Sequence, residues 1–187
     1  MSDFRRLDEV LVHQGHVWRV VVADFESPDG VAFRRDIVRS PGAVAVVPLV
    51  FDPEGTPVVV LVRQYRPPYE RRLLEIPAGM RDVDGEPTAE TARRELAEEA
   101  GLVPGRLDLV IELLPSPGLS DSVTTIYLAT GCTPCAQELH GPEEEHSEVV
   151  QLSLVEAVAM IERGEIADAK TVAGLLLTER RLRAADG

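Results

Sequence analysis

A loop and a helix at residues 75–102 (EIPAGMRDVDGEPTAETARRELAEEAGL) constrain the fold of this chain more than any other segment. We expect Thr88 to cap the start of the helix and Gly101 to end it in the left-handed conformation that often follows a helix. Small and apolar side chains recur along one side of it, at Ala89, Ala92, Leu96 and Ala100. This spacing predicts an amphipathic helix that packs against other secondary structure.

The same helix also concentrates carboxylates. Glu95, Glu98 and Glu99 share one narrow face at about 100° per residue, although like charges one turn apart destabilise a helix slightly. A divalent cation explains the arrangement, because Mg²⁺ prefers a few carboxylate oxygens, keeps several waters and bridges to substrate phosphates. The alternative is a solvated acidic face paired with Arg93 and Arg94, which is the usual meaning of a charge run.

The order of residues in this helix is more specific than its composition. It reads Arg-Glu-apolar-x-Glu-Glu-x-Gly-apolar from Arg94 to Leu102, and it follows a glycine loop and Glu86. This order resembles the Nudix box, G-x5-E-x7-R-E-U-x-E-E-x-G-U, where U is apolar. Six residues separate Gly79 from Glu86, one more than in the box. The resemblance favours a metal site over a solvated acidic face.

Length and charge exclude several classes of protein. The chain has 187 residues, enough for one domain with a short extension. Its net charge of −13 argues against nucleic acid as a partner, because phosphate backbones are bound by basic patches. The longest apolar run, residues 43–51, is too short to span a bilayer, and the N-terminus has no signal-peptide core. We therefore expect a cytoplasmic protein that does not interact with membranes.

Strands precede and follow the predicted helix. Runs rich in β-branched residues predict strands, bounded by turn residues, at 16–24, 34–38, 43–51, 57–64, 106–114, 122–128 and 148–152. Two amphipathic helices are expected at 154–163 and 167–183. This pattern predicts an α/β (α+β) fold, with residues 1–40 as an N-terminal strand-rich extension and 41–187 as the main domain. The Nudix resemblance implies a mixed sheet in an α/β/α sandwich.

Segments outside the box resemble the ADP-ribose pyrophosphatase branch of the Nudix family, including its actinobacterial members. They are RQYRPP at 63–68, LLEIPAG at 73–79, SPG at 116–118 and GEIADAK at 164–170. Pro117 lies fifteen positions past the box, where that branch characteristically carries a proline. Arginines beside a proline-rich turn are also good candidates for phosphate contacts, because guanidinium groups bind phosphate in bidentate fashion.

The resemblance implies roles for particular residues. The residues implied to bind Mg²⁺ or Mn²⁺ are Glu95, Glu99 and the backbone carbonyl of Ala78, with Glu98 as a further ligand or a catalytic residue. Arg94 would hold these glutamates in position. The residues implied in substrate binding are Arg63, Arg66, Glu75 and Pro117.

A general base is also needed, and the acidic loop GPEEEH contains the candidates. In the resembling branch a loop glutamate shortly before a strand is the usual base, which favours Glu145 and leaves Glu143 and Glu144 as alternates. The implied reaction is hydrolysis of the pyrophosphate bond of ADP-ribose, in a homodimer whose N-terminal strands are exchanged between subunits. Two alternatives remain: a hydrolase of another nucleotide, and a non-catalytic ligand-sensing module.

Overall fold

The computed structural model describes residues 3–139 and 145–185. The chain divides into two compact units. The first consists of Met1–Gly42 and Leu114–Val123, and the second of Ala43–Leu113 and Thr124–Gly187. The segment Leu114–Val123 thus belongs with the N-terminal strands, which the sequence alone did not indicate.

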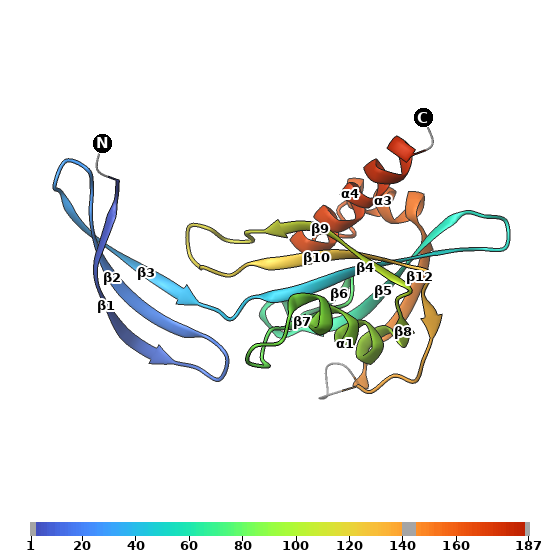
Figure 1. Ribbon diagram of the computed structural model, residues 1–187, viewed down its shortest axis with the longest axis horizontal. Coiled ribbons are helices and arrows are strands. Elements are labelled where there is room, and N and C mark those ends of the chain that lie inside the picture. Colours follow the sequence, from blue (N-terminus) through green and yellow to red (C-terminus); the bar gives the residue numbers. More distant parts are fainter. Residues whose placement is uncertain (1–2, 140–144, 186–187) are drawn as a thin grey trace. The chain divides into compact units, whose positions relative to one another are not determined.

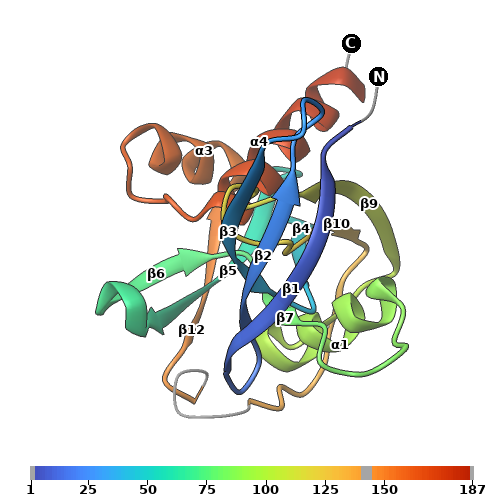
Figure 2. The same ribbon diagram turned by 90° about the vertical axis from the view of Figure 1, so that its left-hand side faces the viewer.

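The first unit is a three-stranded antiparallel sheet in the order β1-β2-β3, shown face-on in Figure 2. Its strands are β1 (Arg5–Gln14), β2 (Arg19–Glu26) and β3 (Ala32–Arg39). The strand β1 was not expected from the sequence, since its alternation is weak and nearly all of its side chains are exposed. A backbone hydrogen bond of 2.9 Å from Val38 to Leu119 connects β3 to the segment Leu114–Val123.

The second unit contains a seven-stranded sheet in the order β12-β5-β4-β10-β9, with β6 paired to β5 and β7 paired to β4. The pairing of β4 with β10 is parallel and the other pairings are antiparallel, so the sheet is mixed. Two short strands, β8 (Leu102–Val103) and β11 (Thr133–Pro134), pair separately. The strands of the main sheet are β4 (Ala43–Phe51), β5 (Pro57–Arg66), β6 (Arg71–Glu75), β7 (Ala78–Met80), β9 (Arg106–Leu113), β10 (Thr124–Thr130) and β12 (Glu148–Ser153).

Helices cover both faces of this sheet, as Figure 1 shows. Successive side chains of a strand point to opposite faces. On β4, Val44 and Val46 pack with Ala92 and Leu96 of α1 (Thr88–Ala100). Ala45, Val47 and Leu49 join the core formed with α3 (Leu154–Glu162) and α4 (Ala169–Ala185). The expected mixed sheet in an α/β/α sandwich is therefore confirmed.

The ends of α1 test the expected caps. Gly101 follows the helix with a φ of 63°, the left-handed conformation that was expected. The expected N-cap at Thr88 is wrong, because Pro87 occupies that position and makes no side-chain capping bond. The hydroxyl of Thr88 lies instead 2.7 Å from the hydroxyl of Tyr127 on β10. The group that was expected to cap the helix therefore makes a tertiary hydrogen bond.

Within the described ranges, every helix is too short or too polar to cross a membrane.

Candidate active site

A half-buried ion pair joins the antiparallel strands β5 and β6. Glu75, the last residue of β6, is only 1% exposed. Arg66, the last residue of β5, donates from Nε and Nη2 to the two Glu75 carboxylate oxygens, each at 2.8 Å. This fork fixes the guanidinium plane. The Arg66 side chain is 36% exposed, so its outer edge faces solvent while its inner edge is held by a buried anion.

The first turn of α4 closes around the same carboxylate. Lys170 Nζ donates to Glu75 Oε2 and, at 2.9 Å, to Asp168 Oδ2. Asp168 caps α4, since its carboxylate accepts hydrogen bonds from the backbone N–H and the hydroxyl of Thr171 at 3.0 and 2.6 Å. The Thr171 hydroxyl accepts the N–H of Ile76 at 3.0 Å. Two cations and two carboxylates, namely Arg66, Glu75, Asp168 and Lys170, form what we term the balanced cluster.

The charge of Glu75 is set by this cluster. Burial alone would raise the pKa of its carboxyl, since an ionised group loses solvation. The hydrogen bonds from Arg66 and the charge of Lys170 outweigh burial and lower the pKa of Glu75 to about 2. Glu75 is therefore ionised at neutral pH and can anchor both cations.

A second group of carboxylates surrounds Arg94 on α1. The guanidinium of Arg94 lies 2.8 Å from Glu95, 3.1 Å from Glu98, 3.4 Å from Glu86 and 3.5 Å from Asp82. One arginine thus serves four carboxylates, and we term these five residues the acidic cluster. The carboxylates outweigh the effect of burial and raise the pKa of Arg94. Among the described residues nothing accepts a hydrogen bond from the buried Nε of Arg94.

The backbone of β7 passes directly over α1. A Cβ at Gly79 would overlap the carboxylate of Glu95 in its present position, so any other residue would require the carboxylate or the backbone to move. The backbone N–H of Ala78 donates to Glu99 Oε2 at 2.8 Å. Glu95 and Glu99 are 7% and 5% exposed. Burying two carboxylates one turn apart is costly unless a cation accompanies them.

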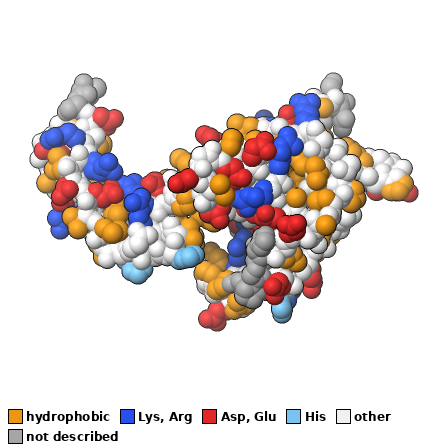
Figure 3. Space-filling view, turned by 60° about the horizontal axis from the view of Figure 1, so that its bottom comes forward, with side chains coloured by type: hydrophobic (Ala, Val, Ile, Leu, Met, Phe, Trp, Pro, Cys, Tyr) orange, Lys and Arg blue, Asp and Glu red, His pale blue; other side chains and the backbone are white. Residues whose placement is uncertain are grey.

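A hard dication fits this arrangement. The structure holds no cluster of three histidine, cysteine, aspartate or glutamate side chains able to bind a metal within residues 3–139 and 145–185. Mg²⁺ does not require one, because it keeps several waters and uses one or two carboxylates. Three features agree with such an ion: the oxygen donors, the close approach of Gly79 to Glu95, and the excess of negative charge. Figure 3 shows acidic and basic side chains next to one another on the surface of the second unit.

The comparisons with known proteins agree with this geometry. The model of the NUDIX domain matches residues 40–175. The chain belongs to the Nudix family. An ADP-ribose pyrophosphatase of Bacillus subtilis is 38% identical over 160 residues, which cover 86% of this chain and 84% of that protein. One of Mycobacterium tuberculosis is 36% identical over 178 residues, covering 93% and 82%.

A solved structure gives the same result for the fold. The crystal structure of an ADP compounds hydrolase superposes with a TM-score of 0.81 at 28% identity, and covers 99% of this chain and 97% of that chain. These findings confirm the Nudix resemblance. Nudix hydrolases generally use divalent metals such as Mg²⁺, in agreement with the donors on α1.

The other residues singled out by the Nudix resemblance lie in different surroundings. Arg63 is on β5, with its Nε 3.7 Å from Glu148 on β12, and Arg72 lies 3.5 Å from the same carboxylate. Glu145 is exposed and precedes the first residue of β12 by three positions. The alternates Glu143 and Glu144 lie outside the described residues. Which glutamate acts as the base stays a prediction.

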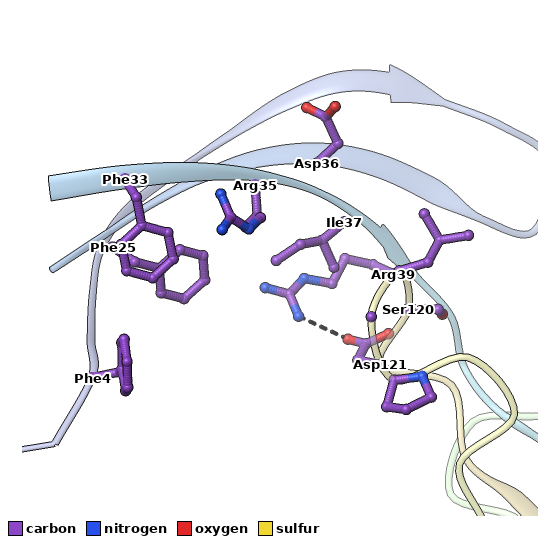
Figure 4. Close-up of a pocket in the computed structure, with 12 residues that line it drawn as sticks. Phe4, Phe25, Phe33, Arg35, Asp36, Ile37, Arg39, Ser120 and Asp121 are labelled. Carbon is purple, nitrogen blue, oxygen red and sulfur yellow. Dashed lines mark hydrogen bonds and ion pairs between the residues drawn. The ribbon is translucent and has the colours of Figure 1, made fainter. Parts of the chain in front are cut away.

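Pro117 belongs to the first unit. It lines a pocket of about 550 Å³ whose other side consists of aromatic and arginine side chains (Figure 4). Phe33 stacks on Phe25 with ring centroids 5.4 Å apart, and the guanidinium of Arg35 lies 4.9 Å from the Phe33 ring. Arg39 donates to Asp121 at 3.0 Å. The substrate role expected for Pro117 stays a prediction.

Sequence reasoning missed the residues that hold the balanced cluster together. Asp168 and Lys170 were noted only within a segment resembling the family, and Thr171 follows that segment directly. An aspartate directly before a helical pattern is a typical N-cap, and this signal could have identified the cap. The contact of Lys170 with Glu75 spans 95 residues, and only tertiary structure shows it.

Proposed function

We propose that this protein is an ADP-ribose pyrophosphatase, which hydrolyses the pyrophosphate bond of ADP-ribose to AMP and ribose 5-phosphate with the help of Mg²⁺ or Mn²⁺. The observation that carries the proposal is the acidic cluster with the neighbouring Glu99, since every charged residue of the Nudix box is present and the box lies on a buried helix face. A ligand-sensing module without catalysis would not need these glutamates. Relatives over 30% identical that are named ADP-ribose pyrophosphatases support the substrate.

The residues proposed to hold the metal are Glu95, Glu99 and the carbonyl of Ala78, with Glu98 beside them. When bound, a divalent ion neutralises the diphosphate and lowers the pKa of a coordinated water. Arg94 keeps the glutamates apart and in register, as its contacts with Glu95 and Glu98 at 2.8 and 3.1 Å suggest. Gly79 permits the backbone approach that places Ala78 beside Glu99.

Substrate contacts are assigned to two arginines of β5. Arg66 offers the guanidinium donors that Glu75 does not use, and these can bind a phosphate or a ribose hydroxyl. Glu75 orients Arg66 and contributes to the same substrate site. Arg63 and Pro117 are further contacts inferred from the branch resemblance. Glu145 is the proposed general base, with Glu143 and Glu144 as alternates, and it would take a proton from the attacking water.

We also propose a homodimer formed through residues 1–40, the N-terminal extension of the main domain at 41–187. The first unit exposes apolar side chains that a monomer would normally bury, including Phe4, Val10, Leu11 and Val12. Exchange of these strands between subunits would cover them. Light scattering on the purified protein tests this assembly, and a monomer at micromolar concentration would contradict it. A cytoplasmic location stays part of the proposal.

The experiment that tests the function is product analysis with ADP-ribose and Mg²⁺ for the wild type, Glu99→Gln and Glu90→Gln. Glu90 is a matched control, because it lies on the same helix but is exposed and occupies an unspecified position of the box. We expect AMP and ribose 5-phosphate from the wild type and from Glu90→Gln. Glu99→Gln should lose about 1,000-fold in kcat, comparable to other losses of preorganised electrostatic stabilisation.

Two results would change the conclusion. Turnover of a different nucleotide with none of ADP-ribose would keep the hydrolase and replace the substrate. No turnover of ADP-ribose, nucleoside triphosphates or dinucleotides with either Mg²⁺ or Mn²⁺ would favour the ligand-sensing module.

A further inference from the structure

Lys170 contacts the carboxylate of Glu75, which also holds Arg66, the arginine proposed to bind substrate. It does not belong to the Nudix box. Its side chain is 14% exposed and its ammonium group contacts two carboxylates, one of them the nearly inaccessible Glu75. Holding a lysine in such a place costs rotamer freedom and solvation. The position therefore calls for a reason beyond filling space.

Charge gives the first reason. Arg66 and Glu75 cancel one another, and Asp168, which α4 uses as its cap, adds a further negative charge. The charge of Lys170 offsets Asp168. Without it the balanced cluster would be net negative beside the place proposed for a diphosphate, and an anionic substrate would be repelled.

Geometry gives the second reason. Arg66 and Lys170 share the Glu75 carboxylate, since Arg66 Nη2 and Lys170 Nζ both donate to Oε2. Without Lys170, only Arg66 would hold the Glu75 carboxylate. The Arg66 side chain is 36% exposed and has room to move, so the two groups could rotate together. Lys170 belongs to the helix α4, and its hydrogen bond ties the carboxylate to the rigid core of the unit. The orientation of the guanidinium is then fixed by α4.

We propose that Lys170 is a positioning residue for substrate binding, which holds Glu75 in place so that Arg66 presents its free donors and an undiminished positive charge to the substrate. This inference rests on the proposed function for the identity of the substrate. The placement of Arg66 by Lys170 is a property of the protein alone and can be measured without any substrate.

The first measurement is kinetic. Lys170→Met should raise KM for ADP-ribose about tenfold with kcat changed less than threefold, the effect expected when one charge-assisted hydrogen bond no longer orients the arginine. Lys170→Arg restores the charge and should bring KM to within threefold of the wild type. The matched control is Arg181→Met, which removes another cation of α4, one that donates to the carbonyls of Leu109 and Val110. It should leave KM unchanged.

The second measurement needs no activity. The Nε–H signal of Arg66 in a ¹⁵N-edited NMR spectrum can be assigned by its absence in Arg66→Lys. We expect slow solvent exchange of this proton in the wild type and in Arg181→Met, and at least tenfold faster exchange in Lys170→Met. If Lys170→Met does not fold, Lys170→Gln, which keeps an N–H donor without the charge, replaces it and should raise KM at least threefold.

The two readouts separate failure of the inference from failure of the proposed function. Faster exchange at Arg66 in a protein that does not cleave ADP-ribose would support the placement by Lys170 and overturn the substrate. Unchanged KM and unchanged exchange in Lys170→Met, together with loss of thermal stability like that of Arg181→Met, would overturn the inference and leave Lys170 a purely structural residue.

Discussion

The balanced cluster and the acidic cluster use the same residue type in opposite ways. In the first, Glu75 is enclosed by Arg66 and Lys170, and its charge is satisfied by the protein itself. In the second, Arg94 is shared among four carboxylates, and Glu99 lies on the same helix. The protein completes the first cluster and leaves the second with an excess of negative charge. A glutamate enclosed by cations therefore positions its neighbours, whereas the glutamates of α1 are the ones proposed to bind a metal.

The largest expected effect breaks the balanced cluster. Glu75→Gln should lower the free energy of unfolding at pH 7 by about 3 kcal/mol, because Arg66 and Lys170 lose a buried counter-charge. The pKa of Glu75 is about 2 when folded, against 4.5 for an unperturbed glutamate. A lowered pKa stabilises the fold above the unfolded value, so the contribution is complete above about pH 5 and is lost as pH falls toward 2.

Urea unfolding of the wild type and Glu75→Gln at several pH values measures this effect. The difference between the two proteins should shrink from pH 6 to pH 2. A difference that stays constant over that range would show that Glu75 does not carry its charge in the folded protein. Glu90→Gln, on the exposed side of α1, is the control and should change stability by less than about 0.5 kcal/mol.

The next effect disturbs the acidic cluster without removing a charge. Gly79→Ala places a methyl group where the Glu95 carboxylate now lies, so either β7 or the glutamate has to move. We expect kcat to fall about 100-fold, since small displacements of catalytic groups have effects of this size. Gly55→Ala, in a turn where a φ of 84° strains any other residue, is a control for a glycine replacement that costs stability without touching the acidic cluster. Full activity of Gly79→Ala would contradict the close approach.

Metal dependence of stability distinguishes the two clusters directly. At a Mg²⁺ concentration of about ten times Kd, the wild type should gain about 1.4 kcal/mol of stability, and excess chelator should remove the gain. Glu99→Gln should lose this gain, whereas Lys170→Met should keep it, because Lys170 belongs to the balanced cluster. Thermal unfolding with and without Mg²⁺ measures both. Equal responses of the two variants would mean that the clusters are not independent.

The smallest effect lies outside both clusters. Glu148 contacts Arg63 and Arg72 across 3.7 and 3.5 Å on an exposed surface. Glu148→Gln should change the free energy of unfolding by less than about 0.5 kcal/mol, because solvent screens such pairs. Raising the salt concentration should remove even this difference, in contrast to the buried Glu75. A loss of more than about 2 kcal/mol would place Glu148 among the structurally essential residues.

The sequence by itself determined the sheet-and-helix pattern, the box helix and its family. Short runs of apolar and β-branched residues identify β4, β5 and β10, since a strand covered on both faces is apolar along most of its length. Gly101 was predictable because a left-handed helix end favours glycine. These features depend on neighbours in the chain, and local rules describe them.

Features that depend on long-range contacts could be read only from the tertiary structure. Thr88 looked like a cap but bonds to Tyr127, 39 residues away. The strand β1 carries little local signal, and pairing with β2 forms it. The carboxylates of Glu75 and Glu99 look alike in the sequence. Glu75 accepts a hydrogen bond from a lysine 95 residues further on, and Glu99 accepts one from the backbone N–H of Ala78. Folding brings these partners together, and the partners determine the charge of a buried group.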